Sequence, residues 1–119
     1  MQRAKAARAE MKENGKLLLA LHLEAENANL ILLSEGKDKL GTLAVAIPQA
    51  QKMLGPPLSS VLLGERYTLT ARFLAEQLAR RTGKIALVSA FSKTLTEKEA
   101  SSMFLKLFEK TLREGRRME

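Results

Sequence analysis

The chain contains no cysteine and no tryptophan, and only one tyrosine and one histidine among its 119 residues. Without cysteine it forms no disulfide and has no thiolate ligand for a metal. It also lacks an apolar run of the roughly 18 to 20 residues that a membrane-spanning helix needs, and residues 1–15 lack the apolar core of a signal peptide. We therefore expect a cytoplasmic protein that does not cross a membrane.

Charge is the first unusual property, because the formal net charge is +7 and the excess lies near the two ends of the chain. Nucleic-acid binding proteins combine such charge with aromatic stacking residues or a recognisable motif. Here the four phenylalanines and one tyrosine form no such cluster. We therefore expect solvated basic ends and no nucleic-acid partner, and a small basic RNA-associated protein is the alternative.

Hydrophobic residues make up 45% of the chain and charged residues 28%, which is the composition of one folded domain at this length. Residues 1–14 show no sustained apolar stripe, so we predict a basic N-terminal tail or frayed helix there, followed by a single domain over 15–119. Alternating apolar residues predict strands, and a 3.6-residue period with capping signals predicts helices. The predicted strands cover 17–25, 30–34, 42–47, 59–63 and 84–91, and the predicted helices cover 68–82 and 96 to about 115.

These elements predict an α+β fold, a single domain with an antiparallel sheet of about five or six strands and two main helices. Two helices can cover one face of such a sheet, yet several strands, 84–91 most clearly, are apolar on both faces. Something else must cover the second face. A second copy of the chain is the simplest cover and predicts a dimer, whereas a sheet that curls into a small barrel needs no partner.

The predicted helix over 68–82 carries large apolar residues on two opposite sides. One side is a core stripe of alanines and leucines, whereas Leu69 and Phe73 fall on the other, charged side. The loop from Pro56 to Leu58 or the N-terminal tail could cover these two side chains, or a protein partner could contact them. Both alternatives stay open at this point. The second defines a candidate protein interface made of Leu69, Arg72, Phe73, Glu76 and Arg80.

The search for catalytic residues yields no site. His22 is the only histidine, and Glu24 points to the same side of its strand, so the two are a weak candidate for acid–base chemistry. No motif ties a serine or second carboxylate to them, and a surface pair is the favoured interpretation. Ser59 and Ser60 lack the context of a nucleophile elbow, and the glycines are too scattered for a phosphate-binding loop. We predict no enzyme and no catalytic, cofactor-binding or metal-binding residue.

The most informative stretch runs from residue 42 to residue 91. TLAVAIP at 42–48 is followed by SSVLLGERYTLTARFLAEQLARRTGKIALVSAF at 59–91. The order of LAVA, an S-x-x-LLG turn and an LA-x-x-LAR-basic-T helix that leads into an apolar strand resembles the proteasome assembly chaperone 4 family, one half of the chaperone 3/4 pair. The sequence departs from that pattern at Arg66-Tyr67 and in the basic extension before Lys16.

The resemblance implies an α+β fold of antiparallel strands with helices, pairing with a related chain, and transient binding of alpha-type subunits while the proteasome core particle assembles. It implies no cofactor and no reaction. We therefore expect a non-enzymatic binding module that acts as a homodimer or as a heterodimer with a related chaperone. A generic scaffolding module of profilin-like or roadblock-like build is a further alternative.

Overall fold

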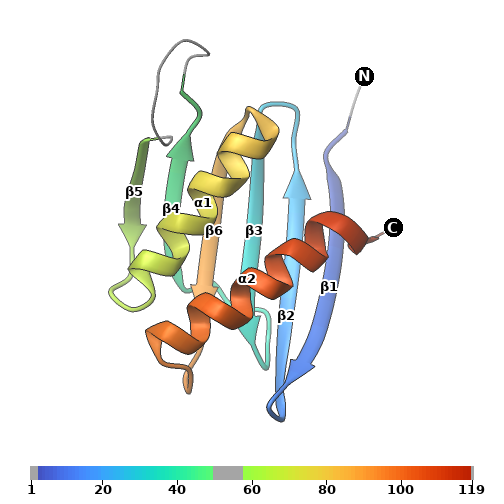
Figure 1. Cartoon of the computed structure of the whole chain (residues 1–119). Coiled ribbons are helices and arrows are strands. Elements are labelled where there is room, and N and C mark those ends of the chain that lie inside the picture. Colours follow the sequence, from blue (N-terminus) through green and yellow to red (C-terminus); the bar gives the residue numbers. More distant parts are fainter. Residues whose placement is uncertain (1–2, 50–57, 119) are drawn as a thin grey trace.

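Two helices lie on the same face of a mixed β-sheet (Figure 1). This computed structural model describes residues 3–49 and 58–118. The elements in chain order are β1 Lys5–Glu13, β2 Lys16–Glu24, β3 Ala28–Glu35, β4 Thr42–Ile47, β5 Leu58–Leu63, α1 Thr68–Thr82, β6 Ile85–Phe91, α2 Glu97–Glu114 and β7 Arg116–Arg117.

The strand order across the sheet is β5-β4-β6-β3-β2-β1-β7. This order has two ends, so the sheet is open and the small barrel is not formed. Every neighbouring pair is antiparallel except β3 and β6, which run parallel. The α+β class and the two main helices are confirmed. The sheet is nevertheless mixed and has seven strands, whereas the sequence pattern predicts about five or six antiparallel ones.

The tail or frayed helix predicted over 1–14 is wrong for residues 5–13, which form β1. The apolar positions of this segment alternate, but most of them are alanines, which give only a weak strand signal. The strand forms because it pairs with β2 along its whole length. Asn14 and Gly15 adopt positive φ values of 52° and 75° and make the tight turn of this hairpin.

The core lies between the two helices and the sheet face beneath them. Helix α1 packs on β4, β5 and β6, while α2 packs on β1, β2 and β3, and the two helices also contact each other. Alanines on β4 and β6 allow α1 to approach the sheet closely, and larger residues on β2 and β3 fill the space beneath α2. The buried core includes Leu18, Ile31, Leu33, Ala44, Ala46, Leu74, Leu78, Ala86, Val88, Phe104, Leu107 and Phe108.

The end of α1 and the start of α2 lie where local sequence signals place them. Gly83 ends α1 with a positive φ of 68°, and its N–H donates to the carbonyl of Ala79. Thr96 and Glu99 form the predicted capping box at the start of α2, with donor–acceptor distances of 2.9 and 3.1 Å. Arg81 of α1 and Glu109 of α2 make a two-pronged ion pair with both contacts at 2.6 Å. This hydrogen bonding holds the pKa of Glu109 below its ordinary value.

Tyr67 connects the start of α1 to the loop that precedes α2. The residue has a positive φ of 62° and is only 4% exposed. Its hydroxyl donates to the carbonyl of Leu95 at 2.6 Å and lies 3.2 Å from the carbonyl of Ser92. Tyr67 therefore ties the start of α1 to the residues that precede α2.

We expect Tyr67→Phe to lower the free energy of unfolding by about 1 to 2 kcal/mol, because the buried Leu95 carbonyl loses its shortest hydrogen bond. Denaturant titration would measure this change. Leu69→Ala, at an exposed position two residues later, is the control and should change stability by less than about 0.5 kcal/mol. Equal stability of the wild type and Tyr67→Phe would show that the hydroxyl contributes nothing.

Candidate protein interface

The five residues predicted as an interface share the side of α1 that faces away from the sheet. Leu69 and Phe73 expose 69% and 48% of their surface, and Arg72 and Arg80 are exposed as well. The opposite side of the helix is buried and forms the core stripe that the helical wheel predicts. The structure therefore leaves two large apolar side chains on a charged helix face. Their contact with a partner stays a prediction.

This side of α1 is connected to the edge strand β5. The hydroxyl of Ser59 donates to the carboxylate of Glu76, and Nε of Arg72 donates to the same hydroxyl oxygen at 3.2 Å. Strand and helix thus form one continuous surface. We call it the α1–β5 surface and define it as β5 together with Leu69, Arg72, Phe73, Glu76 and Arg80.

The N-terminal segment and the loop over 56–58 are the two local covers considered for Leu69 and Phe73. The N-terminal segment does not cover them, because residues 5–13 form β1 near the opposite end of the strand order. The other possible cover is the loop over 56–58. Residues 56 and 57 lie outside the described residues, and Leu58 is itself 69% exposed. In the part of the chain that the structure describes, both side chains remain exposed.

The second face of the sheet is largely apolar, and within residues 3–49 and 58–118 it carries no helix, since α1 and α2 both lie on the other face (Figure 1). Strand register places the odd-numbered leucines of β2 on this second face, while Leu18 and Ala20 enter the core. The sequence predicts a second face in need of a cover but does not single out these side chains as a site. The open sheet face, as we call it, consists of Leu17, Leu19, Leu21, Leu23, Leu30, Leu32, Leu43, Val45, Leu87 and Phe91.

Charged residues border the open sheet face along β1. In the register of β1 and β2, Arg8 lies opposite Leu21, Glu10 opposite Leu19 and Lys12 opposite Leu17. Opposite residues of an antiparallel pair share a face, so these exposed side chains form a charged row beside the leucines. An apolar centre with a charged border is the composition of a protein–protein interface.

The two basic ends of the sequence meet at the β1–β7 edge. Arg8 lies opposite Arg116 in the strand register, and Nζ of Lys110 donates to the carbonyl of Glu10 at 2.8 Å. A hollow of about 990 Å³ lies here and is lined by cations and carboxylates together. The carboxylates of Glu10, Asp38 and Glu114 interrupt the positive charge of Arg8, Lys110, Arg116 and Arg117.

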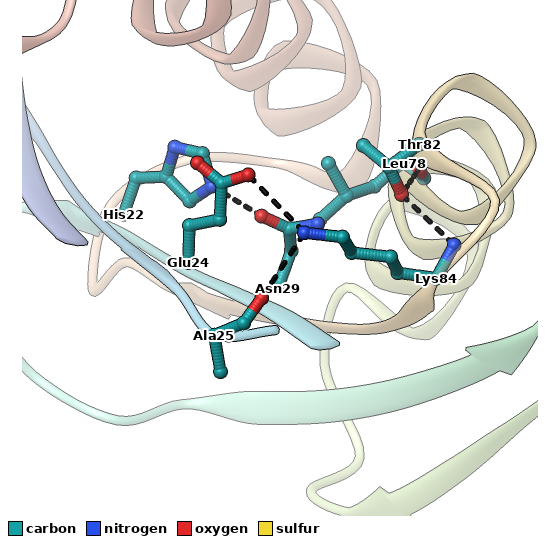
Figure 2. A network of polar contacts seen from close by, with 7 residues as sticks. All are labelled: His22, Glu24, Ala25, Asn29, Leu78, Thr82 and Lys84. Carbon is teal, nitrogen blue, oxygen red and sulfur yellow. Dashed lines mark hydrogen bonds and ion pairs between the residues drawn. The ribbon is translucent and has the colours of Figure 1, made fainter. Parts of the chain in front are cut away.

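His22 supports a buried amide and does not form the surface pair with Glu24 that the sequence favours (Figure 2). Its Nε2 lies 2.8 Å from Oδ1 of Asn29, a side chain that is only 2% exposed. Nδ2 of Asn29 has no hydrogen-bond partner among the described residues. Glu24 instead pairs with Nζ of Lys84 at 3.3 Å, and Lys84 also donates to the carbonyl of Ala25 at 3.1 Å.

Within residues 3–49 and 58–118, no three His, Cys, Asp or Glu side chains gather in a way that could hold a metal ion. Ser59 is hydrogen-bonded to Arg72 and Glu76, whereas an activated nucleophilic serine is paired with a base such as histidine. Neither α1 nor α2 has the length and apolar character that a bilayer-crossing helix requires.

The fold resembles that of a protein in a solved crystal structure. A chain from a crystal structure described as a novel chaperone complex for yeast 20S proteasome assembly superposes with a TM-score of 0.71, and the match covers 94% of each chain at 14% sequence identity. No family model matches this chain, and no curated protein matches it. At this level of identity the likeness shows that the two chains share a fold.

We expect His22→Ala to destabilise the fold by about 1 to 3 kcal/mol, because Asn29 would lose its hydrogen bond while its amide stays buried. His22→Gln, which keeps a donor near the same place, should recover part of this loss. Thermal melting would compare the variants with the wild type. Wild-type stability of His22→Ala would show that Asn29 does not depend on the histidine.

Proposed function

We propose that the chain is a non-enzymatic assembly chaperone that acts as a dimer and transiently binds alpha-type proteasome subunits in the cytoplasm. Two observations support the chaperone role. The first is the fold shared with a chain of the yeast chaperone complex for 20S proteasome assembly. The second is the resemblance of residues 42–91 to the proteasome assembly chaperone 4 family.

The open sheet face is the single observation that carries the proposed dimer. Ten apolar side chains stand on this face, and both helices cover the other one. Two such faces can stack about 10 Å apart, as in a β-sandwich, and bury their leucines against each other. The charged row of Arg8, Glu10 and Lys12 would then lie at the border and fix the relative orientation of the two sheets. A second copy of the chain provides the required face without a further protein.

The α1–β5 surface is the proposed contact for the alpha-type subunit. It includes the exposed side of α1, which lies on the helix side of the sheet and would remain accessible after two open sheet faces had stacked. It offers Leu69 and Phe73 as apolar anchors among the charges of Arg72, Glu76 and Arg80. One molecule can therefore pair with its copy and hold a client at the same time.

A small RNA-associated protein is the second candidate, because the structure brings both basic ends to the β1–β7 edge. The carboxylates that line the same hollow argue against it, since they would repel phosphates. Salt dependence separates the two functions. Binding through phosphates weakens by orders of magnitude between about 50 and 200 mM salt, whereas binding through Leu69 and Phe73 should change little.

The dimer is tested with Leu30→Glu, which places a carboxylate near the centre of the open sheet face between Leu23 and Leu87. Wild-type protein should sediment at twice the 13.2 kDa chain mass, and Leu30→Glu at the single mass, because burying an unpaired charge costs several kcal/mol. Leu69→Glu, on the other side of the molecule, is the control and should remain a dimer. A monomeric wild type at micromolar concentration would contradict the proposed dimer.

The client is tested by mixing the wild type with individually expressed alpha-type proteasome subunits and measuring coelution in size-exclusion chromatography. We expect the wild type to form a complex with at least one alpha-type subunit. Leu69→Glu should weaken the affinity of this complex by about tenfold or more, whereas Leu30→Glu should lower the fraction of dimer. Titration with labelled RNA runs in parallel. Binding of RNA with a steep loss in salt, and of no alpha-type subunit, would overturn the proposed function in favour of the second candidate.

A further inference from the structure

Among the residues that the structure describes, nothing covers the outer edge of strand β5. It stands at one end of the strand order, so its outer backbone N–H and C=O groups have no strand partner among the described residues. Its sequence, LSSVLL, contains no charged residue in a chain that is 28% charged. Edge strands of monomeric proteins usually carry lysines, prolines or a covering segment that prevents pairing with other chains.

The opposite end of the same sheet has these protections. Strand β1 carries Lys5, Arg8, Glu10, Lys12 and Glu13. Part of its outer side is paired with the two-residue strand β7. Lys110 of α2 also donates to a carbonyl of β1. The contrast between the two ends indicates that β5 is left open for a contact, because the same chain protects an edge elsewhere.

Exposed apolar side chains gather around β5. The described residues include ten large hydrophobic side chains that are exposed, and six of them lie on β5, at the adjacent end of β4 or on the outer side of α1. They occur on both faces of the sheet edge. Ile47 and Leu58 lie opposite each other in the register and share the open-face side, whereas the residues of α1 lie on the helix side. The six residues are Ile47, Leu58, Leu62, Leu63, Leu69 and Phe73.

We propose that β5 receives an extended segment of the client protein as an additional strand of the sheet, with apolar residues of that segment resting on Leu69 and Phe73. The inference rests on the proposed chaperone function and names its mode of binding. An added strand would satisfy the free backbone groups of β5, and its side chains would alternate between the α1 side and the open-face side. Pairing would run from Leu58 up to Leu62, where the register with β4 shifts at a bulge.

Charge favours a client segment over a second copy of this chain at β5. Arg72 and Arg80 form no ion pair with a carboxylate in the described part of the chain, and the carboxylate of Glu76 already accepts from Ser59. A segment with an acidic residue beside its apolar ones would pair with these arginines. Two copies joined at β5 would instead bring the arginines of two α1 helices toward one another.

The probe is a fluorescein-labelled peptide of alternating valine and threonine with a glutamate at each end. We expect the dimeric wild type to bind it. A peptide of the same sequence with alternate residues N-methylated keeps its side chains but cannot donate hydrogen bonds along one edge, and it should bind at least about tenfold more weakly. Equal binding of the two peptides overturns strand addition.

Two variants locate the site. Leu62→Lys places a lysine on the edge at a side chain that is 55% exposed, and Leu40→Lys makes the same change at a loop residue that is 56% exposed. Leu62→Lys and Phe73→Glu should each weaken peptide binding by about tenfold or more. Leu40→Lys should stay within about twofold of the wild type. Thermal melts establish that each variant is folded, and unchanged binding by folded Leu62→Lys overturns the site.

Hydrogen exchange with a bound alpha-type subunit separates this inference from the proposed function. Protection of β5 amides on binding supports both. An alpha-type subunit that binds the wild type and Leu62→Lys equally, without protecting β5, overturns strand addition and leaves the chaperone function standing. Peptide binding as expected, without binding of any alpha-type subunit, overturns the chaperone function and keeps the strand site.

Self-assembly is a further outcome. If the wild type forms assemblies larger than a dimer and Leu62→Lys returns them to a dimer, a second copy of the chain occupies β5, and the client segment is overturned.

Discussion

Packing of both helices on one face of the sheet is the constraint on which the rest of the structure depends. The central strands β2, β3, β4 and β6 are largely apolar on both faces, but α1 and α2 lie side by side on the same face (Figure 1). Burial stabilises apolar surface by about 25 cal/mol per Å², so a second leucine-rich face in water is a strong driving force for association. The one-sided helix layer is thus the physical reason for proposing a dimer.

Small residues make this one-sided arrangement possible. Alanines of β4 and β6 lie under α1, so that the helix and sheet approach closely and both helices fit over the six long strands. Tyr67 and the Arg81–Glu109 ion pair then fix α1 relative to the chain around α2. The helix layer is therefore held by its own contacts and can present a fixed outer surface.

Three separate surfaces result from this arrangement. The open sheet face is apolar with a charged border, and the α1–β5 surface joins exposed apolar side chains to a strand edge that has no strand partner among the described residues. The β1–β7 edge mixes cations with carboxylates and adjoins the open sheet face at Arg8 and Glu10. The side of α1 that bears Leu69 and Phe73 lies away from the open sheet face, so a dimer contact and a client contact on this helix can form at once. The proposed function requires this separation, because the pairing of two copies must not block the client.

The sequence by itself determined the elements whose signals are local. Strand β4 ends before Pro48, α1 covers Thr68–Thr82 and ends at Gly83, and α2 begins at the Thr96 cap, all as predicted, because proline, glycine and capping residues act on the chain next to them. The helical wheel also placed Leu69 and Phe73 on the exposed side of α1. These properties need no knowledge of distant residues.

Only the tertiary structure decided the properties that depend on pairing between distant segments. The alanine-rich segment 5–13 becomes a strand because β2 pairs with it. Strands β3 and β6 run parallel because the chain crosses the sheet through α1. The helices pack on the face that holds Leu18 and leave the face that holds Leu19 open. Long-range pairing likewise joins His22 to Asn29 and brings the two basic ends together. The open edge of β5 beside α1 follows from the strand order, which no local pattern encodes because each strand can pair on either side.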